Sequence, residues 1–269
     1  LDHLLESDMD PLGAPFVHAC VEATKQAFTV RDREITDPAY MSVDPQSLLE
    51  TELLAAMAGR IDRQRAAPWG KGMGPADTIW MGVVVEQGVA VSFIQSIYHE
   101  FGSGIVLPGS GVNWQNRGCS FALDATARNP YTPGRKPFHT LNPAMARFAD
   151  GRTLVYGNMG GDGQPQSQSA VFSRIANFGM NPLAAIDAPR WLLGRTWGNS
   201  SETLKVESRF PLESIDALKA LGHDVEVLGA YDESMGHAGA IMRYPSGLLE
   251  GAVFHERGHG LLLHPGAKG

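Results

Sequence analysis

One residue whose type and position could support catalysis is a threonine at the start of an apolar run. Thr78 follows the Gly- and Pro-rich stretch 66–77 and begins the apolar, β-branched run 78–86. A threonine hydroxyl is a weak nucleophile until a base takes its proton. A free α-amine on the same residue is a suitable base, because its unperturbed pKa is about 8. Taken alone, a threonine at the start of a strand is explained by its β-propensity.

Two adjacent glycines are a second candidate. Gly160 and Gly161 follow residues 153–157, which are typical of a strand, and precede residues 165–179, which are typical of a helix. A glycine backbone can approach a substrate closely, and N–H groups at such a junction could stabilise the oxyanion formed in amide hydrolysis. A lone Gly-Gly pair is also typical of an ordinary turn.

Residues 255–259 match HExxH, the zinc-protease pattern in which two histidines one helical turn apart bind the metal and the glutamate acts as base. The pattern works only on a helix. Here it follows strand-like residues 249–254, and Gly258 and Gly260 disfavour a helix. His264 is a possible third ligand, but its spacing is not the extended metzincin one. The context favours a surface turn over a zinc hydrolase, and metal analysis would separate the two.

Hydrophobic periodicity indicates the elements that must position these residues. Apolar side chains at helical spacing predict helices over 14–29 and 45–60. The stretch 66–77 has little periodicity and is predicted to be an exposed linker. Residues 78–86 and 89–96 predict a hairpin of buried strands.

Beyond the hairpin, strand and helix patterns alternate. Helices are predicted over 165–179 and 212–221, and strands over 153–157, 224–228, 239–244 and 249–254. Strands separated by helices indicate a layered α+β sandwich.

Three motifs follow one another at close, ordered spacing. PGRKPFHTLNPAM begins at Pro133, NMGGDGQPQ at Asn158 and FGMNPLAAIDAPRW at Phe178. Together they resemble the γ-glutamyltranspeptidase family, and the resemblance covers essentially the whole chain. Members of that family are N-terminal-nucleophile hydrolases, in which a precursor cuts itself and the exposed threonine becomes nucleophile and general base. The resemblance implies a four-layer αββα sandwich.

The resemblance also implies roles for particular residues. It puts Thr78 at the position of the catalytic threonine and the cleavage site between Asp77 and Thr78. Ser96 falls where the family has a hydroxyl residue that assists the nucleophile, although it is otherwise read as a polar residue at a strand end. MGGDGQPQ is similar to the oxyanion segment, which gives that role to Gly160 and Gly161.

The same resemblance divides the chain at that bond. Residues 1–77 would be the helical C-terminal part of the large-subunit region, and residues 78–269 the small catalytic subunit. The N-terminal segment of the same precursor is the expected partner in a heterodimer and would carry roughly half the fold. Without it, unpaired sheet and apolar surface should be exposed. If the bond before Thr78 stays intact, the molecule is instead a zymogen, a variant trapped before cleavage, or an inactive relative.

The match departs from the glutamyl-transferring branch where that branch holds glutamate. The branch has two serines after its KRP and an acidic residue after its NN-Q segment, whereas this chain has KPFHT at 136–140 and NWQNRGCS at 113–120. The candidate substrate-binding residues are Gln115, Arg117, His139 and Thr140. Arg117 and His139 suit an acid or a dicarbonyl, but they could also be a surface charge and a structural histidine.

These departures resemble the amidohydrolase and acylase side of the family, which includes oxamate amidohydrolase and cephalosporin-acylase-like proteins. The predicted activity is cleavage of the C–N bond of a small acidic amide, oxamate-like or an acyl amide. A γ-glutamyl hydrolase or transferase of the glutathione type is the alternative. The sequence DAPRW at 187–191 is expected to be structural, with an Asp–Arg pair that pins a helix to the core.

Composition excludes several other classes. The 269 residues are 43% hydrophobic and can bury a sizeable core. A net charge of -7 without a Lys/Arg cluster offers no surface for nucleic acid or anionic lipid, and no apolar run is long enough to span a membrane. Cys20 and Cys119 lack metal-type spacing and are expected to be buried thiols. No metal or cofactor is implied, and no compartment is indicated.

Overall fold

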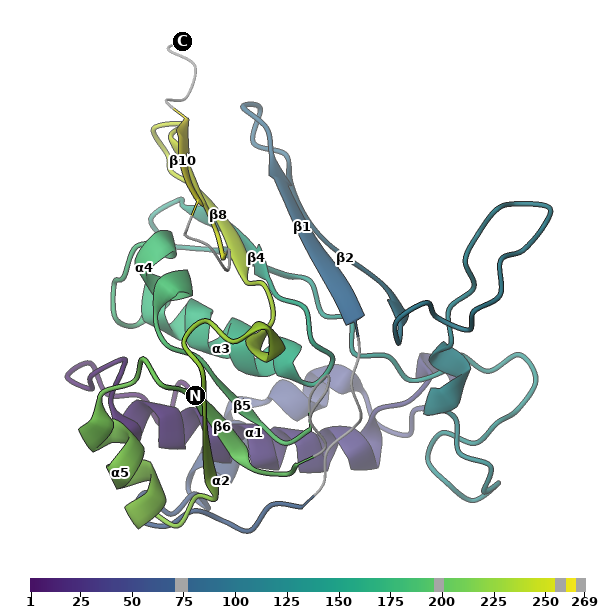
Figure 1. Cartoon of the computed structure of the whole chain (residues 1–269), viewed down its shortest axis with the longest axis horizontal. Coiled ribbons are helices and arrows are strands. Elements are labelled where there is room, and N and C mark those ends of the chain that lie inside the picture. The colour runs from purple at the N-terminus through teal and green to yellow at the C-terminus, as the bar shows by residue number, and fades with distance from the viewer. Residues whose placement is uncertain (71–76, 196–200, 255–259, 265–269) are drawn as a thin grey trace.

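A computed structural model describes residues 1–70, 77–195, 201–254 and 260–264 (Figure 1). The helices are α1 (Ala14–Glu34), α2 (Thr51–Ala58), α3 (Gly163–Ala176), α4 (Pro182–Asp187) and α5 (Leu212–Ala220). Short 3-10 helices are η1 (Pro38–Tyr40), η2 (Pro45–Leu49), η3 (Arg117–Ser120) and η4 (Glu233–Met235). The strands are β1 (Asp77–Val84), β2 (Ala90–Tyr98), β3 (Ala144–Arg147), β4 (Thr153–Gly157), β5 (Trp191–Leu193), β6 (Leu204–Glu207), β7 (Val225–Leu228), β8 (Gly239–Arg243), β9 (Leu249–Val253) and β10 (Gly260–His264).

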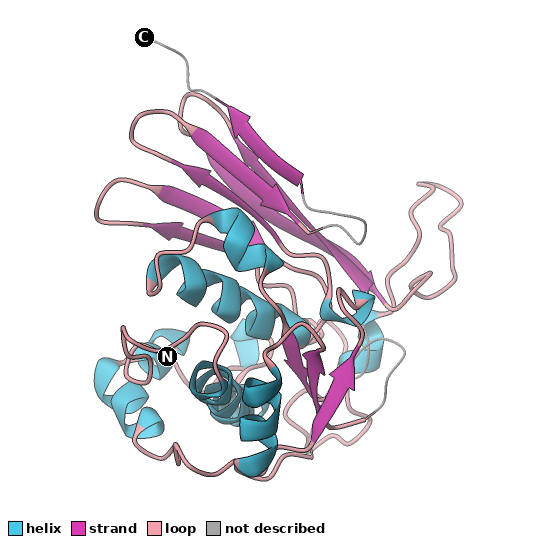
Figure 2. Cartoon of the chain, turned by 60° about the vertical axis from the view of Figure 1, so that its left-hand side comes forward, coloured by secondary structure: helices cyan, strands magenta, loops and turns pink. Residues whose placement is uncertain are grey.

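The strands in the described residues form three sheets. β1 and β2 make an antiparallel hairpin, and a five-stranded antiparallel sheet has the order β10-β9-β8-β4-β3. The third sheet has the order β5-β6-β7, with β6 and β7 parallel. It lies among the helices, away from the larger sheet (Figure 2). No helix in these residues is long and apolar enough to cross a membrane.

The hairpin packs against one face of the five-stranded sheet, and α3 and α4 cover the other face (Figure 1). The contact between the two sheets is made by Trp80 of β1. Its indole lies on the paired residues Gly157 and Gly239 of β4 and β8, where there is no room for a Cβ. Its Nε1 donates to Ser92 Oγ of β2 at 2.9 Å. Helices, sheet and hairpin are three layers of an αββα sandwich.

Helix α3 is shared between two hydrophobic cores. Val171 and Ile175 pack against β4, β8, β9 and α4 in one core. Ala170 packs in the other, which contains Phe16 of α1 together with β5, β6 and α5. The region before Thr78 therefore shares a core with the region after it.

Two predictions about the first 77 residues are wrong in part. The helix predicted over 45–60 is broken at Glu50, whose extended backbone (φ -61°, ψ 134°) separates η2 from α2. The hydrophobic spacing continues through the break, so periodicity alone does not report it. The start of the linker is docked, because Ala66 N donates to Leu221 O at 2.7 Å and Lys25 Nζ to Ala67 O at 2.6 Å.

The hairpin is found where it was predicted, but its strands are buried on one face only. The other face exposes Ile79, Val83 and Phe93 by 56%, 54% and 48%. These side chains alternate with those that face the sheet. No layer in the described residues covers them, and this exposure agrees with the expected uncovered apolar surface.

Two further predictions need correction. Cys119 is exposed rather than buried, because it lies on η3 at the surface, whereas Cys20 is buried in α1. Arg190 pairs with Glu207 at 2.8 Å, and Asp187 pairs with Arg209 at 3.4 Å, in place of the expected Asp187–Arg190 pair. The segment is structural, as expected, but its ion pairs reach across to other elements.

Candidate active site around Thr78

Thr78 lies at an irregular place in the hairpin. Asp77 pairs with Tyr98 and Ile79 with Gln95, so the register shifts at Thr78. Bulges of this kind redirect side chains and are common beside active sites. The Thr78 side chain is buried, and its Oγ1 has no hydrogen-bond partner among the described residues. A buried hydroxyl without a partner is unusual in a purely structural position.

The packing of β1 on the sheet brings Thr78 toward the two glycines. Trp80 lies on Gly157, the last residue of β4, whereas Gly88, after the turn, lies beside Arg243 at the other end of the paired strands. β1 therefore runs along the sheet from the Gly157 end of β4 toward its Thr153 end. Thr78 precedes Trp80 by two residues, so it lies beyond the Gly157 end of β4. The chain segment that follows β4 there contains Gly160 and Gly161.

Both glycines have left-handed backbones, with φ of +105° at Gly160 and +54° at Gly161. Their carbonyls accept from Gly163 N at 2.8 Å and Gln164 N at 3.1 Å at the start of α3. Their own N–H groups have no acceptor among the described residues. The space beside Gly160 is open. Free N–H groups in a left-handed turn at a helix start are suited to bind an anionic oxygen.

Arg117 is buried, which rules out its interpretation as a surface charge. Its guanidinium lies 3.9 Å from the ring centre of Tyr98, and Nη1 and Nη2 have no hydrogen-bond partner among the described residues. Burial lowers the pKa of Arg117, and the nearby Tyr98 opposes that change. Because Tyr98 pairs with the residue before Thr78, this unpaired cation belongs to the surroundings of the threonine.

The other predicted site residues differ in burial and in whether their polar atoms have partners. His139 keeps much of its surface in solvent, and its Nδ1 accepts from Leu141 N at 3.2 Å. Partial desolvation by its neighbours, together with the charge of Arg117, lowers the pKa of His139. Thr140 is buried, and its Oγ1 has no partner in the described chain.

Ser96 Oγ accepts from Tyr98 N at 2.9 Å. Gln115 is exposed, and its side chain makes no hydrogen bond to the described residues, so the structure does not join it to the others.

A family profile described as gamma-glutamyltranspeptidase matches residues 1–261. The chain belongs to the γ-glutamyltranspeptidase family. It is 59% identical over 252 residues to the oxamate amidohydrolase proenzyme of Klebsiella pneumoniae, covering 94% of this chain and 47% of that protein. It is 42% identical over 238 residues to a glutathione hydrolase-like proenzyme of Bacillus subtilis, covering 88% of this chain and 45% of that protein. The chain spans about half the length of the curated relatives it matches.

Solved structures agree with this assignment. Cephalosporin acylase from Bacillus halodurans matches with a TM-score of 0.76 and 30% identity, over 94% of this chain and 50% of that chain. A γ-glutamyltranspeptidase variant from Pseudomonas nitroreducens matches with a TM-score of 0.56 and 25% identity, over 69% of this chain and 99% of that chain. The α+β fold of the N-terminal-nucleophile hydrolase type is confirmed.

Two residues of this family member are close to the candidate site but were missed in the sequence. Tyr98 has a left-handed backbone (φ +79°) and contacts Arg117. Asp162 directly follows Gly161, is buried and binds Arg31 of α1 at 2.8 Å. A carboxylate next to the two glycines predicted to bind the oxyanion was the available signal for Asp162. Nothing in the local sequence distinguishes Tyr98.

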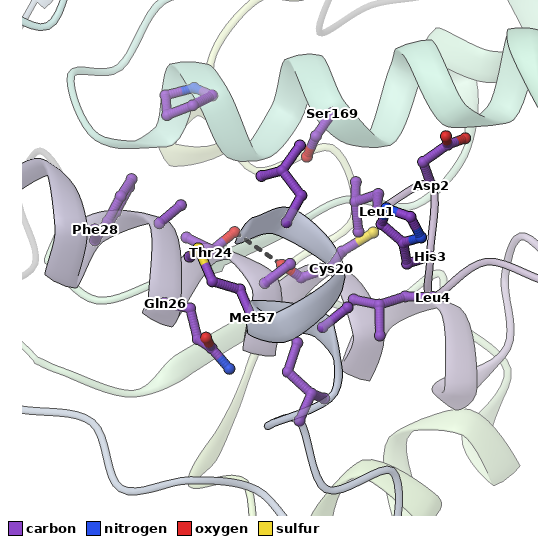
Figure 3. Close-up of a pocket in the computed structure, with 16 residues that line it drawn as sticks. Leu1, Asp2, His3, Leu4, Cys20, Thr24, Gln26, Phe28, Met57 and Ser169 are labelled. Atoms are coloured by element: carbon purple, nitrogen blue, oxygen red, sulfur yellow. Dashed lines mark hydrogen bonds between the residues drawn. The ribbon is translucent and has the colours of Figure 1, made fainter. Parts of the chain in front are cut away.

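A cavity of about 270 Å³ lies elsewhere, between α1, α2, α3 and the first residues of the chain (Figure 3). Its lining is mainly apolar and includes Cys20, Met57 and Phe28. Burial raises the pKa of the Cys20 thiol to about 12, so it is not a nucleophile at neutral pH. The Cys20 thiol therefore does not mark this cavity as a second site of amide hydrolysis.

Among the described residues, His18, Glu22 and His223 have potential metal-ligand atoms within 4.8 Å of one another. These atoms already have partners, because His18 and His223 share a 2.8 Å hydrogen bond and Glu22 binds Lys25 at 2.6 Å. A hydrogen-bonded network accounts for the cluster. The HExxH segment at 255–259 lies outside the described residues. The chain after it is strand β10, so His264 does not continue a helix.

Proposed function

We propose that this chain is the catalytic part of a self-processing amidohydrolase that hydrolyses a small amide bearing a carboxylate, such as oxamate. Thr78 is the nucleophile. Residues 78–269 form the small subunit, and residues 1–77 form the C-terminal part of the large subunit. The 59% identity to the oxamate amidohydrolase proenzyme supports the reaction class. The share of this chain that matches the P. nitroreducens chain, 69%, is similar to the share that follows Asp77 and supports the division.

The observation that carries this proposal is the buried, unpaired guanidinium of Arg117. A buried cation is costly unless an anion completes it, and a guanidinium binds a carboxylate through two parallel hydrogen bonds. Nη1 and Nη2 of Arg117 are the two donors left without partners. Oxamate carries its carboxylate directly on the amide carbon, so one such contact fixes the scissile carbonyl close to the anchor.

Self-processing begins when Thr78 Oγ1 attacks the carbonyl carbon of Asp77. The peptide C–N bond breaks as the acyl group moves to oxygen, and water hydrolyses the ester. The Asp77 carboxylate and the free Thr78 α-amine are the products. The α-amine then serves as the base for later turnovers.

In turnover, Thr78 Oγ1 attacks the amide carbon while its proton moves to the α-amine. The N–H groups of Gly160 and Gly161 stabilise the oxyanion. The C–N bond breaks, the amine returns its proton to the leaving nitrogen, and ammonia departs. Water attacks the remaining ester, releases the acid and regenerates the threonine. Ser96 near the nucleophile assists proton movement, and His139 and Thr140 line the acyl side, as does Gln115.

The remaining N-terminal segment of the precursor is the proposed partner. The outward side of the hairpin exposes Ile79, Val83 and Phe93, which are suited to packing against another layer. The same apolar contact would keep the two subunits together after cleavage.

The test uses the full-length precursor with three amides: oxamate, oxamide without a carboxylate, and a γ-glutamyl anilide. We expect oxamate to be the preferred substrate and oxamide to be a poor one. Arg117→Met should raise the KM for oxamate by at least roughly 30-fold, because the bound carboxylate of oxamate loses its cationic partner. Arg147→Met, on the exposed part of β3, is the matched control. Preference for the γ-glutamyl anilide, or an unchanged KM in Arg117→Met, would contradict the proposal.

A further inference from the structure

We infer that the ion pair between Arg31 and Asp162 holds the oxyanion turn in its active conformation. Arg31 would then be a positioning residue supplied from upstream of the cleavage site. This inference rests on the proposed function. Arg31 Nη1 lies 2.8 Å from Asp162 Oδ1, and Nη2 lies 3.5 Å from Oδ2. The two residues are 131 positions apart, and their side chains are 17% and 6% exposed.

Asp162 is placed where its orientation controls the two glycines. It directly follows Gly161 and occupies the N-cap position of α3, yet its side chain makes no capping hydrogen bond. An aspartate at this position commonly accepts from a helix N–H group. Here the carboxylate is turned toward α1 and Arg31 instead. Its conformation therefore depends on a partner outside the turn.

The turn needs such an anchor because glycines have wide backbone freedom. The direction of the Gly160 and Gly161 N–H groups follows from their left-handed φ values. Their carbonyls are fixed from one side by the first turn of α3. The Arg31–Asp162 contact fixes the adjoining residue from the other side. Oxyanion donors must be held within about 0.5 Å of their productive positions.

The charge of the pair matters as well as its geometry. A buried carboxylate next to the place where an oxyanion forms would oppose that negative charge. Arg31 compensates it. The guanidinium is itself held, with its centre 4.0 Å from the Phe28 ring and its Nε bound to Asp32 at 2.8 Å. Arg31 is thus preorganised to meet Asp162.

The test compares Arg31→Ala with Arg33→Ala in the full-length precursor. Arg33 lies on the same helix, is 65% exposed and pairs only locally with Glu34. We expect Arg31→Ala to lower kcat on oxamate roughly 10- to 100-fold, as for a small misplacement at a catalytic centre. The KM should change less than about threefold, because the Arg117 anchor is untouched. Arg33→Ala should match the wild type.

A second variant separates positioning from simple loss of structure. Adding Asp162→Asn to Arg31→Ala removes the uncompensated carboxylate, so the double variant should recover part of the lost kcat. Two independent structural losses would instead add. Arg31→Lys, which keeps the charge, should retain more activity than Arg31→Ala and serves if the alanine variant does not fold.

Hydrogen exchange distinguishes this inference from the proposed function. Wild type without activity on any of the amides would overturn the proposed function. Exchange of residues 158–166 can still be measured in that protein, and we expect it to be faster in Arg31→Ala or Arg31→Lys than in Arg33→Ala. Unchanged exchange in this segment, or a kcat equal to that of the wild type, would overturn the inference.

Discussion

Two buried polar clusters in this molecule differ in whether their atoms have partners. Near α1 and α5, His18 binds both His223 and the Asp62 carbonyl at 2.8 Å, and Glu22 binds Lys25. Around Thr78, by contrast, the threonine hydroxyl and the guanidinium nitrogens of Arg117 have no partner in the described residues. Burial is similar in the two places. The first cluster is a satisfied structural network, and under the proposed function the second is the one that binds substrate.

Among variants that keep Thr78, the largest effect is expected from Gly160→Ala. Both Gly160 (φ +105°) and Gly222 (φ +93°) have left-handed backbones with open space beside the Cα. An added methyl group therefore strains either backbone by roughly 1–3 kcal/mol. At Gly160 the strain would also redirect the proposed oxyanion donor, so kcat should fall about 100-fold.

Gly222→Ala, at the end of α5, is the matched control. It should lose a similar amount of stability, measured by thermal unfolding, and retain the wild-type kcat. Equal losses of activity in the two variants would show that backbone strain, rather than the position of Gly160, is responsible.

The next effect concerns the hydrogen-bonded cluster that contains His18 and His223. His18→Ala leaves His223 and the Asp62 carbonyl without their shared partner, so the free energy of unfolding should fall by roughly 2–4 kcal/mol. His3→Ala, at an exposed position, should change it little. Denaturant unfolding measures both. Specific activity at a temperature where the variant is folded should be unchanged. A selective loss of kcat in His18→Ala would contradict the claim that this cluster serves stability and not catalysis.

The last effect, small for each single pH unit, is on the pH dependence of stability. Burial, together with the charges of Lys25 and His18, lowers the pKa of His223 from 6.5 to about 3. Between these values the unfolded chain binds a proton that the folded chain does not. Stability should therefore be complete above pH 6.5 and decline as the pH falls toward 3.

The expected slope from this one group is at most about 1.4 kcal/mol per pH unit. Replacing His223 by Gln should flatten the curve in that window, although overall stability falls. An equally steep curve in the variant would assign the acid sensitivity to other groups.

Elements with a clear apolar pattern could be predicted from the sequence, whereas short elements with a polar or weak pattern could not. Residues 153–157 form β4 with the predicted bounds. β6 was missed because Lys205 and Glu207 give it a polar pattern, although every residue in it is buried. Lys205 Nζ binds the Gly194 carbonyl at 2.7 Å, and Glu207 pairs with Arg190. Such partners are distant in the sequence, so the local pattern does not reveal them. The short elements α4, β3, β5 and β10 were missed as well.

The candidate site shows the same division. Thr78, Gly160 and Arg117 could be selected from motifs, because their roles depend on residue type and family resemblance. Asp162 could not be assigned a role, since its significance comes from Arg31 on another helix. Gln115 is exposed and makes no hydrogen bond to the other candidates in the described chain, so its substrate-binding role stays a prediction from the sequence alone.

The most direct test of the central claim is the intact mass of the full-length precursor over time, beside Thr78→Ala. The account predicts that the wild type splits between Asp77 and Thr78, giving a fragment that begins with a free threonine. Thr78→Ala should stay whole and hydrolyse no oxamate, while Thr126→Ala, on an exposed loop, should split normally. A wild type that stays whole yet hydrolyses oxamate, or a Thr78→Ala precursor that still splits, would contradict the assignment of Thr78 as the nucleophile.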